Sequence, residues 1–80
     1  MHQVINSPLT LGQFLNRVRK SKKLTQHETG QTFKLDQTTI SSIEQGAKGT
    51  RIDTIFRLLA ALDLEMIIQE KGNQQKRIDW

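Results

Sequence analysis

A run of small, uncharged polar side chains lies on what the apolar spacing predicts to be a short helix. Its members are Gln37, Thr38, Thr39, Ser41 and Ser42. Ile40 and Ile43 are spaced to face a core, so at about 100° per residue the polar side chains point away from it. Such groups suit base edges, because glutamine can pair bidentately with adenine and hydroxyl groups can donate or accept. An ordinary solvated helix is the commoner explanation of such a face taken in isolation.

Cationic and hydroxyl side chains flank this helix. Lys34 precedes it, and Lys48, Thr50 and Arg51 lie in the connector that follows. The backbone of a bound duplex would pass the connector, so we predict that these residues contact phosphates, which position a protein on DNA without reading its sequence. A solvated charge is the alternative for each of the three cations.

Helix start signals predict that the polar face belongs to the second of two short helices. Thr25 with Glu28 forms a capping box for the first, over about residues 26–33. Asp36 caps the second, over about residues 37–45, and the glycine that follows can end it. Two short helices joined by a tight turn are typical of a helix-turn-helix.

Two longer helices flank this pair. Ser7 followed by Pro8 starts one over about residues 8–22. Thr50 with Asp53 starts the other, which ends near residue 62 or 63. The apolar positions of this last helix are Ile52, Ile55, Phe56, Leu59 and Leu62. The pattern therefore predicts an all-α domain.

Composition limits the class of protein. Eighty residues suit one domain with a small core, so we expect the chain to gain stability by oligomerising. The net charge of +4 favours polyanionic partners. The absence of cysteine fits a reducing cytoplasm, and the apolar runs are far below the roughly 18 residues needed to span a membrane. The first ten residues lack the pattern of a secretion signal, so we predict a cytoplasmic location.

Nothing in the sequence favours catalysis. His2 lies near the start of the chain and His27 lies on the short second helix, and neither has an acid, base or metal-ligand partner at a suitable spacing. Paired carboxylates and a glycine-rich phosphate loop are lacking too. We therefore predict a protein that is not an enzyme and needs neither a cofactor nor a metal.

Residues 11–64 resemble the Cro and phage-repressor type of helix-turn-helix, the XRE family. The shared residues are Arg19, Leu24, Thr25, Gln26, Glu28, Ile40, Ser41, Ile43, Glu44 and Gly46, followed by the helix end LLAALDL. The resemblance implies a lambda repressor-like domain of four to five helices. It also implies that Gln26 contacts a phosphate, that the next helix enters the major groove, and that Arg19 and Glu44 form a structural ion pair.

Two positions depart from the family pattern. Gly30 stands where the family prefers alanine inside the second helix, which we expect to cost roughly 0.5 to 1 kcal/mol in helix propensity. Lys34 stands where the turn usually has glycine, so a positive φ there would strain the backbone.

The segments SPLTL, TTIS, IEQG and DTIFRLLAALDLEM, with a polar tail that ends in Trp80, are similar to the HipB family of antitoxins. This resemblance implies an autorepressor that pairs with a HipA-like serine/threonine kinase toxin. It also implies a homodimer in which a short strand, at about residues 64–69, pairs with its two-fold mate. The apolar residues of that strand are Leu64, Met66, Ile67 and Ile68. An intramolecular strand is the weaker alternative, since only Val4 and Ile5 could pair with it.

The domain then covers residues 1–71, and residues 72–80 form a flexible tail. Trp80 is the only tryptophan, and an indole is a good anchor for a partner's pocket, although a frayed aromatic residue is the alternative. We predict a homodimeric repressor of an inverted-repeat operator that also binds the kinase. A phage-type repressor without a toxin, or a protein inhibitor in which DNA binding is secondary, are the other interpretations.

Overall fold

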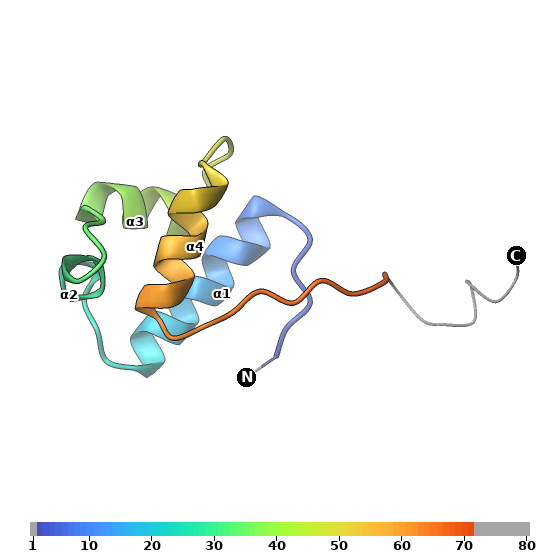
Figure 1. The fold of residues 1–80 in the computed structure, drawn as a ribbon, viewed down its shortest axis with the longest axis horizontal. Coiled ribbons are helices and arrows are strands. Elements are labelled where there is room, and N and C mark those ends of the chain that lie inside the picture. Colours follow the sequence, from blue (N-terminus) through green and yellow to red (C-terminus); the bar gives the residue numbers. More distant parts are fainter. Residues whose placement is uncertain (1, 72–80) are drawn as a thin grey trace, which may run out of the picture.

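The computed structural model describes residues 2–71, which form four helices and no strand (Figure 1). They are α1 (Pro8–Ser21), α2 (Gln26–Gln31), α3 (Gln37–Glu44) and α4 (Ile52–Ala61). The predicted all-helical fold is confirmed, and each helix ends slightly before the predicted residue. No helix in the described part of the chain is long and apolar enough to cross a membrane.

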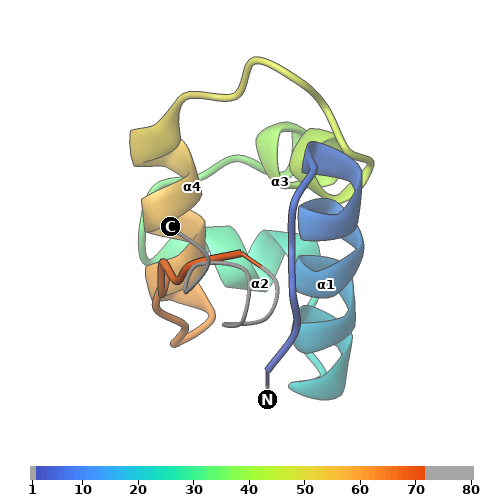
Figure 2. The same ribbon diagram turned by 90° about the vertical axis from the view of Figure 1, so that its right-hand side faces the viewer.

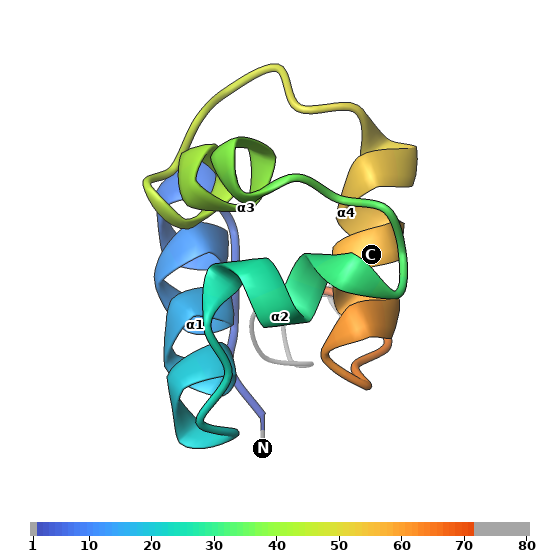
Figure 3. The same cartoon turned by 90° about the vertical axis from the view of Figure 1, so that its left-hand side faces the viewer.

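The helices enclose one small core. α1 and α4 lie on opposite sides of the domain, and α2 and α3 cross between them (Figures 2 and 3). α3 packs on α1 and α2, and α2 also packs on α4. The most deeply buried side chains come from α1, α3, α4 and the residue that follows α4; they are Leu15, Val18, Ile40, Leu58 and Leu62. This packing leaves one face of α2 and α3 open to solvent.

Side-chain caps begin three of the four helices at the predicted residues. Ser7, Thr25 and Asp36 each accept a hydrogen bond from the backbone N–H three residues later. The prediction for α4 was wrong, because its N-cap is Arg51 and not Thr50, and no side chain caps it. Arg51 instead donates a hydrogen bond from its Nε to the Asp53 carboxylate at 3.1 Å.

Every helix is followed by a residue in the left-handed conformation. These residues are Lys23, Lys34, Gly46 and Asp63, with φ between 57° and 87°. In each case the next residue donates its N–H back to a carbonyl in the last turn, as Ala47 does to Ser42 at 3.0 Å. Only Gly46 adopts this conformation without strain; for a residue with a Cβ atom the left-handed region costs roughly 1–2 kcal/mol. The turn at Lys34, with a φ of 57°, therefore has the strained form considered above.

The segment after α4 forms no strand within the described chain. Leu64 is half-buried and packs against the core, whereas Met66, Ile67 and Ile68 are exposed. Val4 and Ile5 do not form a ladder with them. The segment therefore runs away from the helices in extended form without a partner strand (Figure 1). The predicted tail at residues 72–80, with Trp80, lies outside the described residues.

Gly30 is required by close packing, which corrects the sequence-based view that it merely weakens α2. A Cβ atom at this position would lie 2.0 Å from the carbonyl oxygen of Leu35. The Gly30 carbonyl also accepts the N–H of Leu35 at 3.0 Å, so the chain folds back tightly over this residue. Alanine has the higher helix propensity, but there is no space for its methyl group.

We therefore expect Gly30→Ala to lower the free energy of unfolding by about 1 to 3 kcal/mol, as overpacking typically does. Urea denaturation followed by circular dichroism measures this change. Gln31→Ala is the matched control, because Gln31 is the exposed neighbour on α2 and its substitution should change stability by no more than about 0.5 kcal/mol. A Gly30→Ala variant more stable than the wild type would mean that helix propensity outweighs the steric contact.

Candidate nucleic-acid interface

A buried cluster around Glu44 fixes α3 against α1 and α2. The Glu44 carboxylate accepts hydrogen bonds from Arg19 Nε at 2.6 Å and from Arg19 Nη2 at 3.0 Å. Asn16 donates to the same carboxylate at 2.7 Å and Gln26 at 3.1 Å. The remaining Arg19 nitrogen donates to the carbonyl oxygen of Leu24 at 2.7 Å. The structure thus brings together Arg19 and Glu44 and adds two neutral donors to the pair.

The cluster keeps both charges in place. Burial raises the pKa of the Glu44 carboxyl group, but the hydrogen bonds from Arg19, Asn16 and Gln26 outweigh it, so the net shift of the pKa is downward. The hydrogen bond to Glu44 raises the pKa of Arg19 against the opposing effect of burial. Only 10% of the Arg19 side chain and 5% of the Glu44 side chain are exposed. Each ion therefore depends on the other for its stability.

Gln26 is turned toward this cluster. Its Nε2 donates to Glu44, and the residue is half-buried. The family resemblance assigned Gln26 to a phosphate, and that contact would have to use the rest of its amide group. The position of Gln26 at the start of α2 keeps the amide beside the end of α3.

The polar face of α3 is open along most of its length. Gln37, Thr38 and Ser42 are exposed, whereas Thr39 and Ser41 are half-buried. The Asp36 carboxylate accepts the N–H of Thr39 at 3.1 Å, and Gln45 donates to the Ser41 hydroxyl at 3.1 Å. Ser41 is therefore partly occupied within the helix. The groups most accessible to a ligand are Gln37 and Thr38 in the first turn and Ser42 one turn later.

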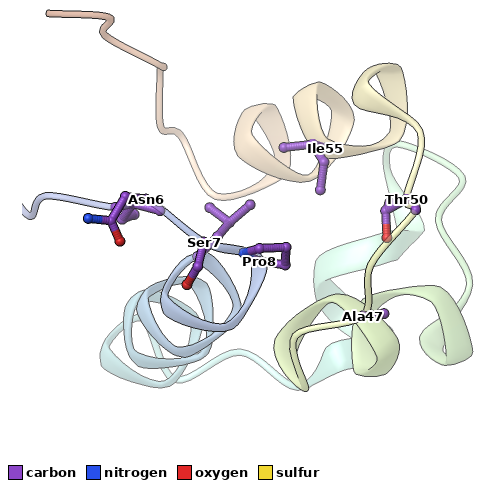
Figure 4. Close-up of a pocket in the computed structure, with 9 residues that line it drawn as sticks. Asn6, Ser7, Pro8, Ala47, Thr50 and Ile55 are labelled. Carbon is purple, nitrogen blue, oxygen red and sulfur yellow. The ribbon is translucent and has the colours of Figure 1, made fainter. Parts of the chain in front are cut away.

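The residues that flank α3 differ in their accessibility. Lys34 and Lys48 are exposed, and the Arg51 side chain is 82% exposed although it pairs with Asp53. Thr50 is half-buried and lines a shallow pocket of ≈ 250 Å³ between the start of α1 and the start of α4 (Figure 4). Its neighbours there include Pro8 and Ile55. Thr50 is thus less available to a phosphate than the three cations.

Comparison with known proteins decides the family. A family model described as helix-turn-helix matches residues 15–69. The antitoxin HipB of Escherichia coli is 30% identical over 84 residues, which cover 98% of this chain and 96% of HipB. The chain belongs to the HipB antitoxin family.

Solved structures of HipB resemble this family member throughout the described domain. A chain of the HipA-HipB-O2-O3 complex has a TM-score of 0.83 and 31% identity, and the match covers 89% of this chain and 100% of that one. The HipB-O4 20mer complex gives a TM-score of 0.84 at 31% identity, with the same coverage. The helix-turn-helix expected from the sequence is thereby confirmed.

The sequence alone did not identify two residues that build this HipB-type domain. Asn16 is a donor to Glu44, and Gly12 allows the backbone of α3 to approach α1. Together with Arg19 they are spaced by four and three residues, which places them on one face of α1. A small and polar stripe on an otherwise apolar helix face was the signal that would have revealed them. Among the described residues, no three acidic, histidine or cysteine side chains gather as a metal site.

The two ion pairs of the described chain should differ sharply in their contribution to stability. Arg19→Met leaves the buried Glu44 without its counter-ion, so we expect it to lower the free energy of unfolding by about 3 to 5 kcal/mol. Arg51→Met breaks an exposed pair and should cost no more than about 1 kcal/mol. Urea denaturation of both variants provides the comparison. Equal losses would show that the Glu44 cluster does not stabilise the fold.

Proposed function

We propose that this chain is a DNA-binding antitoxin that represses its own operon and binds a HipA-type serine/threonine kinase. The observation that carries the proposal is its likeness to a chain of the HipA-HipB-O2-O3 complex, all of which it matches at 31% identity. A HipB chain in that assembly accompanies both HipA and the operators. The same fold with an open polar face on α3 supports both functions here.

On DNA, the first turn of α3 is suited to read bases. Gln37 and Thr38 are exposed there, and the N-terminal residues of a recognition helix are those that reach base edges in the major groove. Thr39, Ser41 and Ser42 line the same helix, and the half-buried pair among them would contribute less. Phosphate contacts would come from Lys34, Lys48, Thr50, Arg51 and Gln26. The net charge of +4 favours this partner.

Exposed apolar side chains support a homodimer. Ile52 and Phe56 lie one turn apart on α4 and are 61% and 50% exposed, and Ile67 and Ile68 are 70% and 88% exposed. Large apolar side chains gathered in this way commonly mark an interface. We propose that residues 64–69 pair as a strand with a second copy, which would also satisfy their free backbone groups. Leu64 then connects the core to the dimer contact formed by Met66, Ile67 and Ile68.

A two-fold dimer implies an inverted-repeat operator. The two α3 helices would enter successive major grooves about 34 Å apart, so the half-sites should lie about one helical turn apart. The same symmetry would present two equivalent surfaces to the kinase. Footprinting that showed a single asymmetric half-site would contradict this arrangement.

Gln37→Ala or Thr38→Ala should weaken binding to the operator by about 1 to 3 kcal/mol and leave weak nonspecific binding largely unchanged. The loss arises because direct contacts to base edges discriminate between sequences. Fluorescence anisotropy with the region upstream of the gene and with an unrelated duplex measures both affinities. Gln13→Ala, an exposed substitution on α1, serves as the matched control. Unchanged specificity in both α3 variants would reject α3 as the reading helix.

Trp80→Ala should weaken binding to a HipA-like kinase without changing operator affinity. A large, flat side chain brings much apolar area at a small rotamer cost, which suits an anchor in a partner's pocket. Calorimetry with the kinase and a gel shift with the operator test the two halves of this prediction. Equal kinase affinity with and without the indole would exclude Trp80 as an anchor. Neutralisation of the kinase by a Gln37→Ala dimer that no longer binds its operator would indicate that inhibition is the main activity.

A further inference from the structure

A second hollow lies on the open face of the domain, between α2 and the beginning of α3. It has a volume of ≈ 340 Å³. Its lining residues are His27, Gly30, Gln31, Lys34, Leu35, Asp36 and Gln37. Gln37 is also the residue proposed above to read a base. A duplex bound by α3 would therefore pass beside this hollow.

The polar side chains of the hollow are accessible and come from three parts of the helix-turn-helix. His27 and Gln31 are exposed and lie one turn apart on α2, which places them on the same side of that helix. Lys34 is exposed in the turn, and Gln37 is exposed at the first position of α3. All four side chains can donate hydrogen bonds, histidine through one ring nitrogen when neutral and through both when protonated. Such a set suits a phosphate oxygen.

The charge of the hollow depends on His27. Lys34 contributes a positive charge, and Asp36 contributes a negative one. Hydrogen bonds from Thr39 lower the pKa of the Asp36 carboxyl group, so it stays ionised. The two fixed charges offset each other, and the net charge of the hollow is zero when His27 is neutral and positive when it is protonated.

The other charged neighbour of His27 is Glu28, which follows it on α2. Its carboxylate is held at the start of α2, where it accepts the N–H of Thr25 at 2.8 Å. α4 also packs on α2, but it contributes no residue to the hollow. No further titratable side chain of the described residues lines this site with His27.

We infer that this hollow binds a phosphate group of the DNA backbone, and that protonation of His27 makes DNA binding tighter as the pH falls. The inference rests on the proposed DNA-binding function. Histidine is the side chain that ordinarily changes its charge between about pH 5 and pH 8. A phosphate favours the protonated ring, so binding takes up a proton, and by linkage a lower pH raises the affinity.

The test measures the affinity of the full-length protein for the duplex from the region upstream of its gene, at about pH 6 and about pH 8 and at constant ionic strength. We expect the dissociation constant of the wild type to be about fivefold lower at the acidic pH. Circular dichroism at both pH values checks that the fold is unchanged.

Three variants assign the effect. His27→Gln should remove most of the pH dependence, because glutamine keeps a donor but does not titrate. His2→Gln is the matched control, since it removes the other, exposed histidine, and it should behave as the wild type does. Lys34→Gln should lower the affinity at both pH values.

The outcomes separate this inference from the proposed function. Wild-type binding that is independent of pH, or a pH dependence that persists in His27→Gln, would overturn the inference and leave the function standing. A pH dependence lost in His2→Gln would place the titrating group elsewhere and also overturn it. Failure of the wild type to bind the upstream duplex at either pH would overturn the proposed function and the inference together.

Discussion

The Glu44 carboxylate is the group on which the relative positions of three helices depend. It lies at the C-terminal end of α3, where the helix dipole is negative, and only 5% of its side chain is exposed. A carboxylate in such a place is stable only when hydrogen-bond donors replace the water that it has lost. Arg19 and Asn16 donate from α1, and Gln26 donates from α2. A shift of either helix relative to α3 would leave a buried charge without full compensation.

Close backbone contact makes this cluster possible. A Cβ atom on Gly12 would lie 2.3 Å from the carbonyl oxygen of Ile43 and 2.7 Å from that of Glu44, so only glycine allows α1 to approach the end of α3 so closely. Asn16 and Arg19 follow Gly12 on the same face of α1 and reach the Glu44 side chain from there. The glycine and the ion pair are therefore two parts of one helix contact. No buried side-chain nitrogen or oxygen of the described residues is left without a partner.

The cluster also determines what α3 shows to solvent. Because Glu44 is turned inward, the exposed side chains of α3 are uncharged, and the one nearby carboxylate, Asp36, caps the helix start. A carboxylate on that face would repel the phosphates of a duplex. The interactions that hold the helix in place thus also keep its outer face compatible with the proposed DNA partner. The exposed surface of α4 and of the segment that follows it is of a different kind, since it is apolar and suits a second protein chain.

The sequence by itself determined the number, order and approximate limits of the helices. Cap residues such as Ser7 and Asp36, and apolar positions such as Ile40 and Ile43, act over a few residues, so local physical chemistry was enough to find them. The resemblance to a known family added the pairing of Arg19 with Glu44, which joins residues 25 positions apart.

Tertiary structure decided the features that depend on what another segment places nearby. Gly30 was expected to weaken α2, yet the carbonyl of Leu35 leaves no space for a side chain there. Phe56 fitted the apolar pattern of α4, yet it is half exposed because no helix of the chain covers that side. Gln26 faces the Glu44 cluster, and His27 shares a hollow with Lys34, because α2 and α3 fold against each other at a fixed angle. Helical periodicity gives the direction of a side chain around its own axis, whereas its neighbours are determined only when the helices pack.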